Sequence, residues 1–302
     1  MSKKESAFIS AVVYSCSNSD KLFSFTLELF NELEKHFANY EIVIVDNCNP
    51  NIESVKSELT ARISASDSIT IVHMSEVQSL EACMRAGVDV AVGDFVYEFE
   101  GISYDFNTDA MWKAYRKAQE GYDIINAEIK NNSISRTMYY NIFNKFSKSK
   151  YDLYAVAFRL VSRRTINRII SLNLDIDWRN AAYANCGLKS ESIEYGAKAS
   201  PKKNRDIFLA IDSFLLYTEL PRKVSIWMGA VGVALIVLSI FMASLTAEWT
   251  STVLSVSLCL SSVIIIALLL LSVYYLSLLL RTSDSRKKYL VDGIEKLQRT
   301  KG

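Results

Sequence analysis

The sequence predicts an α/β domain followed by a hairpin of two membrane-spanning helices. Before residue 220, strand-like and helix-like segments alternate, which is typical of an α/β sheet. The stretches 224–247 and 249–280 contain no charged residue, and only Glu248 separates them. Each is longer than the roughly 20 residues that a helix needs to cross a hydrocarbon layer about 30 Å thick.

The elements of the α/β part follow one another in regular order. The expected strands are 8–13, 41–45, 69–73, 95–99 and 122–127. The expected helices are 20–37, 52–63, 79–90, 107–120 and 165–171. Apolar residues recur at helical spacing in the first helix, and the run IVIV is typical of a strand buried on both faces. Residues 206–220 are expected to form a helix that lies along the membrane interface and is ended by Pro221.

Basic residues flank the apolar hairpin on both sides. Arg222 and Lys223 precede it, and four more basic residues follow it: Arg281, Arg286, Lys287 and Lys288. Cytoplasmic flanks are enriched in Lys and Arg, so both termini are expected in the cytosol. The expected division is a cytosolic domain 1–204, a juxtamembrane helix 205–222, two transmembrane helices 223–281 and a basic cytosolic tail 282–302.

Composition excludes several functional classes. The net charge is only +1, so the chain has no basic field of the kind that binds nucleic acid. Two histidines and five cysteines without a CxxC pair leave little material for a zinc site or a Ser-His-Asp triad. Neither GxxxxGK[ST] nor GxGxxG occurs, which excludes a P-loop and the common dinucleotide motif.

Polar residues follow two strands whose carboxyl-end turns should be adjacent in the fold. Asp46 and Asn47 come after the strand 41–45, and Glu98, Glu100 and Ser103 lie at the end of the strand 95–99 or beyond it. In an open α/β sheet the ligand binds beyond the carboxyl ends of the strands. The alternative is that Asp46 caps its turn and Glu100 sits in a solvated turn.

Six segments in this order resemble a known family: FISAVV, YEIVIVDN, AGVDVAVGDFVYEFEG, EGYDII, AFRLVSRRTINRI and YYLSLLLRTSDSRKKYLV. Together with the hairpin they are similar to GT-A, family-two glycosyltransferases of the polyprenyl-phosphate type, which include dolichol-phosphate mannose synthase and bacterial undecaprenyl-phosphate sugar transferases. The resemblance covers almost the whole chain. It implies a GT-A-like, Rossmann-like nucleotide-sugar-binding domain at the cytosolic face of a bacterial inner membrane.

The chain departs from that family at its metal and donor motifs. Where relatives have VDDGS, this chain has Asp46 followed by Asn47, Cys48 and Asn49. Glu100 falls on the first acid of the family's DxD motif, and Ile102 replaces the second. The resemblance implies donor binding by Asp46, Asn47 and Ser103, and weak binding of Mg²⁺ or Mn²⁺ by Glu100. Glu98 is expected to project away from Glu100 and to be no substitute ligand.

The resemblance also places residues on the acceptor side. Asp152 matches the family's catalytic acid approximately, so Glu100 and Asp152 are the catalytic candidates. The acceptor phosphate would meet a group of basic residues: Arg159, Lys198, Lys202, Lys203 and Arg205. The alternatives are surface salt bridges for Arg159 and attraction to anionic lipids for the lysine cluster.

Two functions follow from these features. The first is transfer of a sugar from a nucleotide sugar to a polyprenyl phosphate in the bilayer, which retention of Asp46, Glu100 and the basic loop favours. The second is a non-catalytic partner subunit in a membrane glycan-assembly system, which loss of the second acid favours. A homo-oligomer formed through the hairpin remains open, and no nucleic-acid partner is expected.

Overall fold

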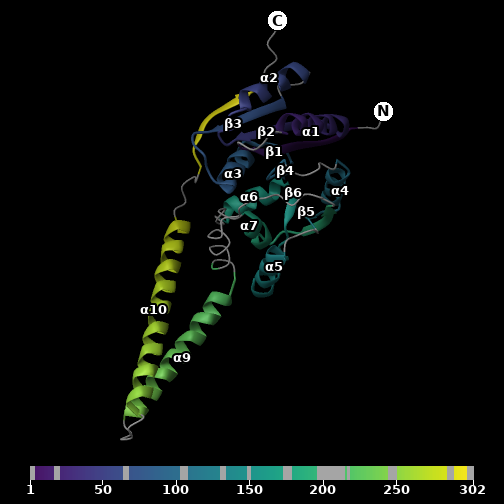
Figure 1. The fold of residues 1–302 in the computed structure, drawn as a ribbon. Helices are drawn as coiled ribbons and strands as arrows, with labels where there is room; N and C mark the ends of the chain where they lie inside the picture. Colours follow the sequence, from purple (N-terminus) through teal and green to yellow (C-terminus); the bar gives the residue numbers. More distant parts are fainter. Residues whose placement is uncertain are drawn as a thin grey trace. The chain divides into compact units, whose positions relative to one another are not determined.

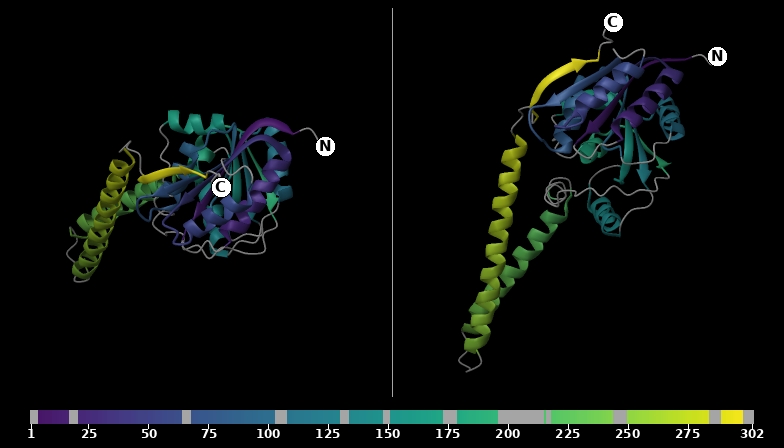
Figure 2. Two further views of the ribbon diagram at one scale, coloured as in Figure 1. Left: turned by 90° about the horizontal axis from the view of Figure 1, so that it is seen from above. Right: turned by 45° about the horizontal axis from the view of Figure 1, so that its top comes forward.

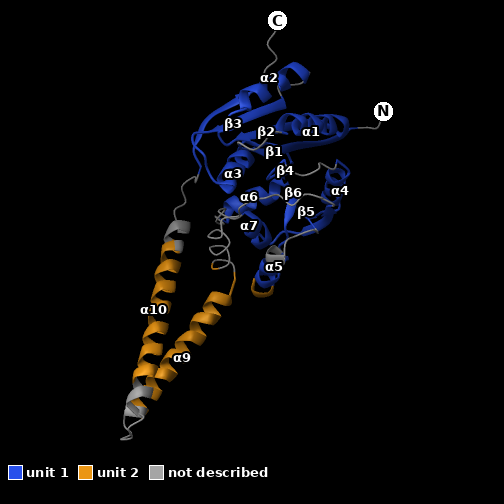
Figure 3. Cartoon of the chain, viewed as in Figure 1, with its two compact units in different colours: residues 1–144, 149–205, 286–302 blue, residues 145–148, 206–285 orange. Residues whose placement is uncertain are grey.

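The structure is a computed structural model, and it describes most of the chain. The described residues are 4–16, 21–63, 68–102, 108–129, 134–147, 151–172, 179–195, 215, 218–243, 250–283 and 289–297. The chain divides into two compact units (Figure 3). Unit 1 comprises 1–144, 149–205 and 286–302, and unit 2 comprises 145–148 and 206–285.

Unit 1 is built on a mixed sheet (Figure 1). Among the described residues, eight strands pair in the order β7-β5-β6-β4-β1-β2-β3-β8. The strands are β1 Glu5–Ser15, β2 Phe37–Asp46, β3 Ile69–Met74, β4 Phe95–Phe99, β5 Ile124–Ile129, β6 Val156–Ser162, β7 Ser190–Tyr195 and β8 Val291–Lys296. The strands β3, β2, β1 and β4 are parallel, whereas β6 and β8 run antiparallel to the strands beside them.

Helices cover both faces of this sheet. One apolar cluster includes side chains of α1 Leu22–His36, α2 Ile52–Arg62 and α4 Thr108–Gln119. The other includes side chains of α3 Leu80–Val90, α6 Arg163–Ser171 and α7 Arg179–Asn185. The predicted α/β sheet followed by two apolar helices is therefore confirmed.

The central strands show why the sheet is apolar on both sides. Along β2, Ile42 and Ile44 enter one cluster, and Val43 and Val45 enter the other. Successive side chains of a strand point to opposite faces, so a continuous apolar run fills both layers. A Cβ at Gly87 of α3 would lie 2.5 Å from a methyl carbon of Val45, so the missing side chain lets α3 pack closely on the sheet.

The chain returns to the sheet after the second apolar helix. β8 pairs antiparallel with β3, with Val72 opposite Ile294, and it forms the edge of the sheet (Figure 2). Leu297, just beyond β8, is 2% exposed and belongs to the apolar cluster around α1 and α2. Part of the predicted tail thus folds as a strand of the same sheet as β1.

Unit 2 contains two long apolar helices, α9 Leu220–Ala243 and α10 Thr250–Ser283. Their segments Leu220–Phe241 and Ser255–Ser277 are long and apolar enough to cross a membrane, judged by length and composition. The two helices contact each other, and the Oγ atoms of Ser239 and Ser257 lie 2.6 Å apart between them.

Several elements differ from the sequence-based expectation. β6, β7, β8, α7 and α5 Ile134–Phe146 are present although none was predicted as such. Pro221 lies in the first turn of α9, which begins at Leu220. Proline fits there because the first backbone N–H groups of a helix have no partner within it. Most of the predicted juxtamembrane helix, 206–214 and 216–217, lies outside the described residues.

Candidate functional site

The order of the strands places a candidate site at the carboxyl ends of β1, β2 and β4. β1 lies between β2 and β4, and all three are parallel. The strand order therefore reverses at β1, with β2 and β3 on one side of it and β4 on the other. In open α/β sheets, ligands bind beyond the carboxyl ends of the strands at such a reversal. Asp46 ends β2, and Glu98 and Glu100 lie at the end of β4.

Asp46 is held by groups of the protein itself. It is 5% exposed, and its Oδ1 accepts a hydrogen bond from the Asn49 backbone N–H at 2.8 Å. Its Oδ2 lies 3.0 Å from Nδ1 of His73 on β3. Cys48, within the turn that Asp46 closes, has φ of 55°. Asp46 therefore stabilises this turn, and its predicted contact with a donor stays a prediction.

Asn47 joins two loops at the same edge of the sheet. Its amide oxygen accepts from the backbone N–H of Gln78 at 2.8 Å, and its amide nitrogen donates to the Gln78 carbonyl at 2.9 Å. The same nitrogen lies 3.0 Å from the Tyr14 hydroxyl. Burial raises the pKa of Tyr14 to about 12, so the phenol stays neutral at physiological pH. Asn47 is 4% exposed and positions the loop before α3.

Glu98 and Glu100 meet at one arginine. Nη1 of Arg179 lies 2.7 Å from Oε2 of Glu98, and Nη2 lies 2.9 Å from Oε1 of Glu100. The expectation that Glu98 projects away from Glu100 is wrong. Side chains alternate along a strand, so residues two apart project to the same side. Glu81 and Tyr183 also contact this cluster, and sequence reasoning assigned a role to neither of them nor to Arg179.

The contacts around Glu100 show whether these residues could bind a divalent cation. Mg²⁺ and similar ions take oxygen ligands directly, at about 2.1 Å. Oε1 of Glu100 already accepts from Arg179, and Ile102, at the position of the second acid, is apolar and 5% exposed. In the part of the chain that the structure describes, no three His, Cys, Asp or Glu side chains form a group that could hold a metal ion. These residues do not fit a divalent cation.

Two residues predicted for the acceptor side line one small pocket. Asp152 and Arg159 lie in its wall together with Asn126, Asn180 and Tyr183. Arg159 is 4% exposed, its Nε donates to Asn126 at 2.7 Å, and its guanidinium carbon lies 4.6 Å from the centre of the Tyr183 ring. Asp152 is exposed at this pocket. Asp152 accepts a long hydrogen bond, 3.4 Å, from the Tyr154 hydroxyl, whereas Arg159 is engaged inside the protein.

The remaining predicted site residues lie outside the described part of the chain. They are Ser103 on the donor side and Lys198, Lys202, Lys203 and Arg205 on the acceptor side. Their roles stay predictions.

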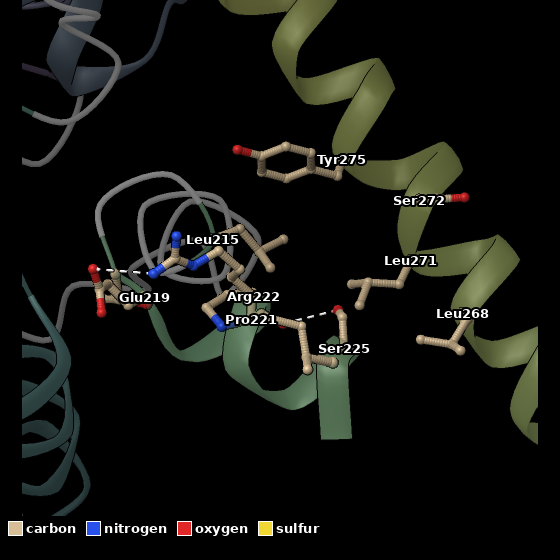
Figure 4. Close-up of a pocket in the computed structure, with 11 residues that line it drawn as sticks. Leu215, Glu219, Pro221, Arg222, Ser225, Leu268, Leu271, Ser272 and Tyr275 are labelled. Carbon is tan, nitrogen blue, oxygen red and sulfur yellow. Dashed lines mark hydrogen bonds and ion pairs between the residues drawn. The ribbon is translucent and has the colours of Figure 1, made fainter. Parts of the chain in front are cut away.

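Unit 2 contains a larger groove between its helices (Figure 4). Its volume is about 530 Å³, within the range of small-molecule sites. Leu268, Leu271 and Tyr275 point from α10 toward the first turns of α9, where Arg222 and Ser225 lie. The wall is largely apolar, and Arg222, which is 3.5 Å from Glu219, places a cation at it. The carboxylate of Glu219 lines the same groove, so an ion pair lies beside the apolar wall.

Comparisons with known proteins give matches in structure alone. No family model matches the sequence, and no curated protein matches it. A mannosyltransferase from Pyrobaculum calidifontis, in complex with GDP-Man and Mn²⁺, is similar with a TM-score of 0.49 and 13% identity over 86% of this chain and 87% of that one. Glucosyl-3-phosphoglycerate synthase from Mycobacterium tuberculosis, in complex with phosphoglyceric acid, is similar with a TM-score of 0.49 and 13% identity. This match covers 69% of this chain and 79% of that one. These similarities concern the course of the chain and assign no substrate to this protein.

Proposed function

We propose that the protein is a membrane-bound glycosyltransferase that moves a sugar from a nucleotide sugar to a polyprenyl phosphate. One observation carries the proposal: the chain leaves the sheet after β7, continues through two candidate spans and returns to the same sheet as β8. Two crossings bring a chain back to the side that it left. The basic flanks favour the cytosol for that side. A domain tethered in this way can meet a soluble donor and a lipid acceptor at one surface.

The proposal divides the chain into four parts. Residues 1–204 are the donor-binding domain, 205–222 the juxtamembrane segment, 223–281 the two spans, and 282–302 the cytosolic tail that contributes β8. The bacterial inner membrane is the proposed location, with both termini in the cytosol.

The proposed transfer is a single displacement. A phosphate oxygen of the acceptor forms a bond to the anomeric carbon of the sugar, and the bond from that carbon to the donor diphosphate breaks. The electron pair leaves with the nucleoside diphosphate. An acceptor phosphate is ionised at pH 7, so no proton has to be removed before attack, and no protein nucleophile is required. Asp152, exposed at its pocket, is the group proposed to orient the reacting partners.

The groove of unit 2 is proposed to hold the acceptor. Its leucines offer an apolar wall to the polyprenyl chain, and Arg222 offers a cation to the phosphate. Arg222 is largely exposed, and its ion pair with Glu219 is a loose one at 3.5 Å, so a doubly charged phosphate can compete for it. On the sequence resemblance alone, Lys198, Lys202, Lys203 and Arg205 stay proposed as residues that bind the acceptor phosphate.

Cross-linking tests the acceptor half of this proposal. A polyprenyl phosphate carrying a photoreactive group near its phosphate should label full-length protein in nanodiscs, and unlabelled polyprenyl phosphate should compete. Leu271→Trp, which fills the groove, should reduce labelling at least tenfold. Leu260→Trp, on an exposed face of the same helix, is the matched control. Equal labelling of the two variants would contradict the proposed site. If polyprenol without phosphate competes as well as polyprenyl phosphate does, the proposed role of the phosphate is contradicted.

A second function is favoured by a different observation. Asp46, Asn47 and Glu100 all bind groups of the protein itself, so the predicted donor and metal residues form a bonded network. A non-catalytic partner subunit would have this character. Such a subunit binds no nucleotide sugar, whereas the enzyme does. Saturation-transfer NMR with a panel of nucleotide sugars separates the two functions.

A further inference from the structure

A single guanidinium group lies among three carboxylates at the end of β4. Nε of Arg179 is 2.7 Å from Oε2 of Glu81, Nη1 is 2.7 Å from Oε2 of Glu98, and Nη2 is 2.9 Å from Oε1 of Glu100. Each nitrogen of the planar group therefore has a different carboxylate as its partner. The Arg179 side chain is 2% exposed, so solvent does not share in these contacts.

The three acids come from different parts of unit 1. Glu81 lies in the first turn of α3, Glu98 lies on β4, and Glu100 follows that strand. Arg179 is the first residue of α7. The fold thus brings together side chains that are far apart in sequence. This convergence is the pattern of a site built around a cation, and in this chain the cation is a side chain.

The surroundings make the arginine hard to replace. Glu98 is 1% exposed, accepts from the Tyr183 hydroxyl, and lies 3.6 Å from Nη1 of Arg159. Burial by itself would lower the pKa of Arg179, but Glu98, Glu81 and Glu100 together raise it well above its usual value. Removing one partner from a buried ion pair is strongly destabilising, because the other charge is left without compensation.

We propose that Arg179 is the permanent counter-ion of the Glu81, Glu98 and Glu100 carboxylates and takes the place that a divalent cation would need there. A divalent cation requires oxygen ligands at about 2.0–2.6 Å around one point, whereas these oxygens are spaced around a planar group at 2.7 to 2.9 Å from its nitrogens. A metal ion could bind only by displacing the guanidinium. The chain therefore binds no divalent cation through Glu98 or Glu100.

Electron paramagnetic resonance of Mn²⁺ tests this assignment on the full-length protein in nanodiscs. Wild-type protein and Glu100→Gln should bind Mn²⁺ equally. Arg179→Gln should acquire a new Mn²⁺ site at least tenfold tighter than any in the wild type, and the double variant Arg179→Gln, Glu100→Gln should lack it. Arg164→Gln is the matched control, because Arg164 is 72% exposed and 3.8 Å from Asp123. This control should acquire no new site.

Two results would overturn the proposal. One is a wild-type Mn²⁺ site that Glu100→Gln abolishes. The other is a folded Arg179→Gln variant that acquires no Mn²⁺ site. If Arg179→Gln does not fold, the comparison of wild type with Glu100→Gln decides by itself. Neither result depends on sugar transfer, so the assignment stands or falls separately from the proposed function.

Discussion

Nζ of Lys56 lies 2.7 Å from Oε2 of Glu295, and this contact joins α2 to the strand that follows the second apolar helix. Nε2 of His73 is 3.8 Å from the same carboxylate, and Nδ1 of that ring is 3.0 Å from Asp46. A path of polar contacts thus connects the returning strand to the acid at the end of β2. The tail is part of the domain's structure and borders the candidate site.

Removal of the returning strand should destabilise unit 1. A chain that ends at residue 288 loses the pairing of β8 with β3 and the buried side chain of Leu297. Burying one leucine contributes about 2 kcal/mol, and the exposed edge of β3 adds to the loss. We expect a clear fall in the midpoint of thermal unfolding, measured by tryptophan fluorescence. A chain that ends at residue 297 keeps β8 and should unfold like wild type; equal midpoints for both truncations would argue against a structural role for β8.

The contact between Lys56 and Glu295 should depend on pH. The hydrogen bond from Lys56 lowers the pKa of Glu295 below 4.5, and the hydrogen bond to Glu295 raises the pKa of Lys56 above 10.5. The stabilisation is present between these ordinary values, is lost as pH falls through the lowered pKa of Glu295, and is lost as pH rises through the raised pKa of Lys56. This partly exposed pair contributes at most about 1 kcal/mol.

The variant Lys56→Met measures this dependence. We expect it to unfold at a lower temperature than wild type at pH 7, and the difference should shrink as pH falls below 4.5. Lys35→Met is the control, because Lys35 is 65% exposed and 3.8 Å from Glu32. A difference for Lys56→Met that is unchanged at pH 3 would show that the effect comes from lost packing.

Replacing Cys48 by glycine should raise the stability of unit 1. Its φ of 55° lies in the left-handed region, which costs residues with a Cβ about 1–2 kcal/mol and glycine very little. Glycine loses part of this advantage because its unfolded chain is freer. We expect Cys48→Gly to stabilise unit 1 by about 1 kcal/mol in urea unfolding. Cys48→Ala keeps the Cβ and should show no gain; a similar gain in both variants would assign the effect to loss of the thiol.

Sequence patterns predicted the elements whose formation depends on residues close together in the chain. Short apolar runs predicted β1 to β4, and length and apolarity predicted the two long helices. The edge strand β8, with sequence VDGIEK, carries three charged residues and reads as a solvated tail unless its pairing with β3 is known. Strand formation depends on such neighbours more than on intrinsic preference.

The candidate site could be predicted in position but not in its contacts. Asp46 and Glu100 do lie at the carboxyl ends of β2 and β4, the two strands on either side of β1. Their partners His73 and Arg179 lie on other segments. The run RNAAYAN around Arg179 carries no signal of a buried charge, because an arginine is mostly exposed unless distant acids surround it.

The proposed topology predicts which residues reagents can reach. In a background without the five native cysteines, a cysteine at Glu248 should react with an impermeant maleimide added outside intact cells. A cysteine at Lys301 should react only after the inner face is exposed. The reason is that two crossings place the connector opposite both termini. Labelling of a cysteine at Lys301 from outside intact cells would contradict the proposed topology.

Sugar transfer itself is the most direct test of the account. Full-length protein in nanodiscs is incubated with a panel of radiolabelled nucleotide sugars and undecaprenyl phosphate, and the organic phase is analysed by mass spectrometry. For one donor we expect a lipid product whose mass equals that of the polyprenyl phosphate plus one sugar residue, with an equal amount of nucleoside diphosphate released. Asp152→Asn should lower the rate by about 10²-fold, because misplaced reacting partners cost a factor of that order. If the wild-type protein neither binds nor turns over any donor in the panel, the account is contradicted and the protein is the non-catalytic subunit.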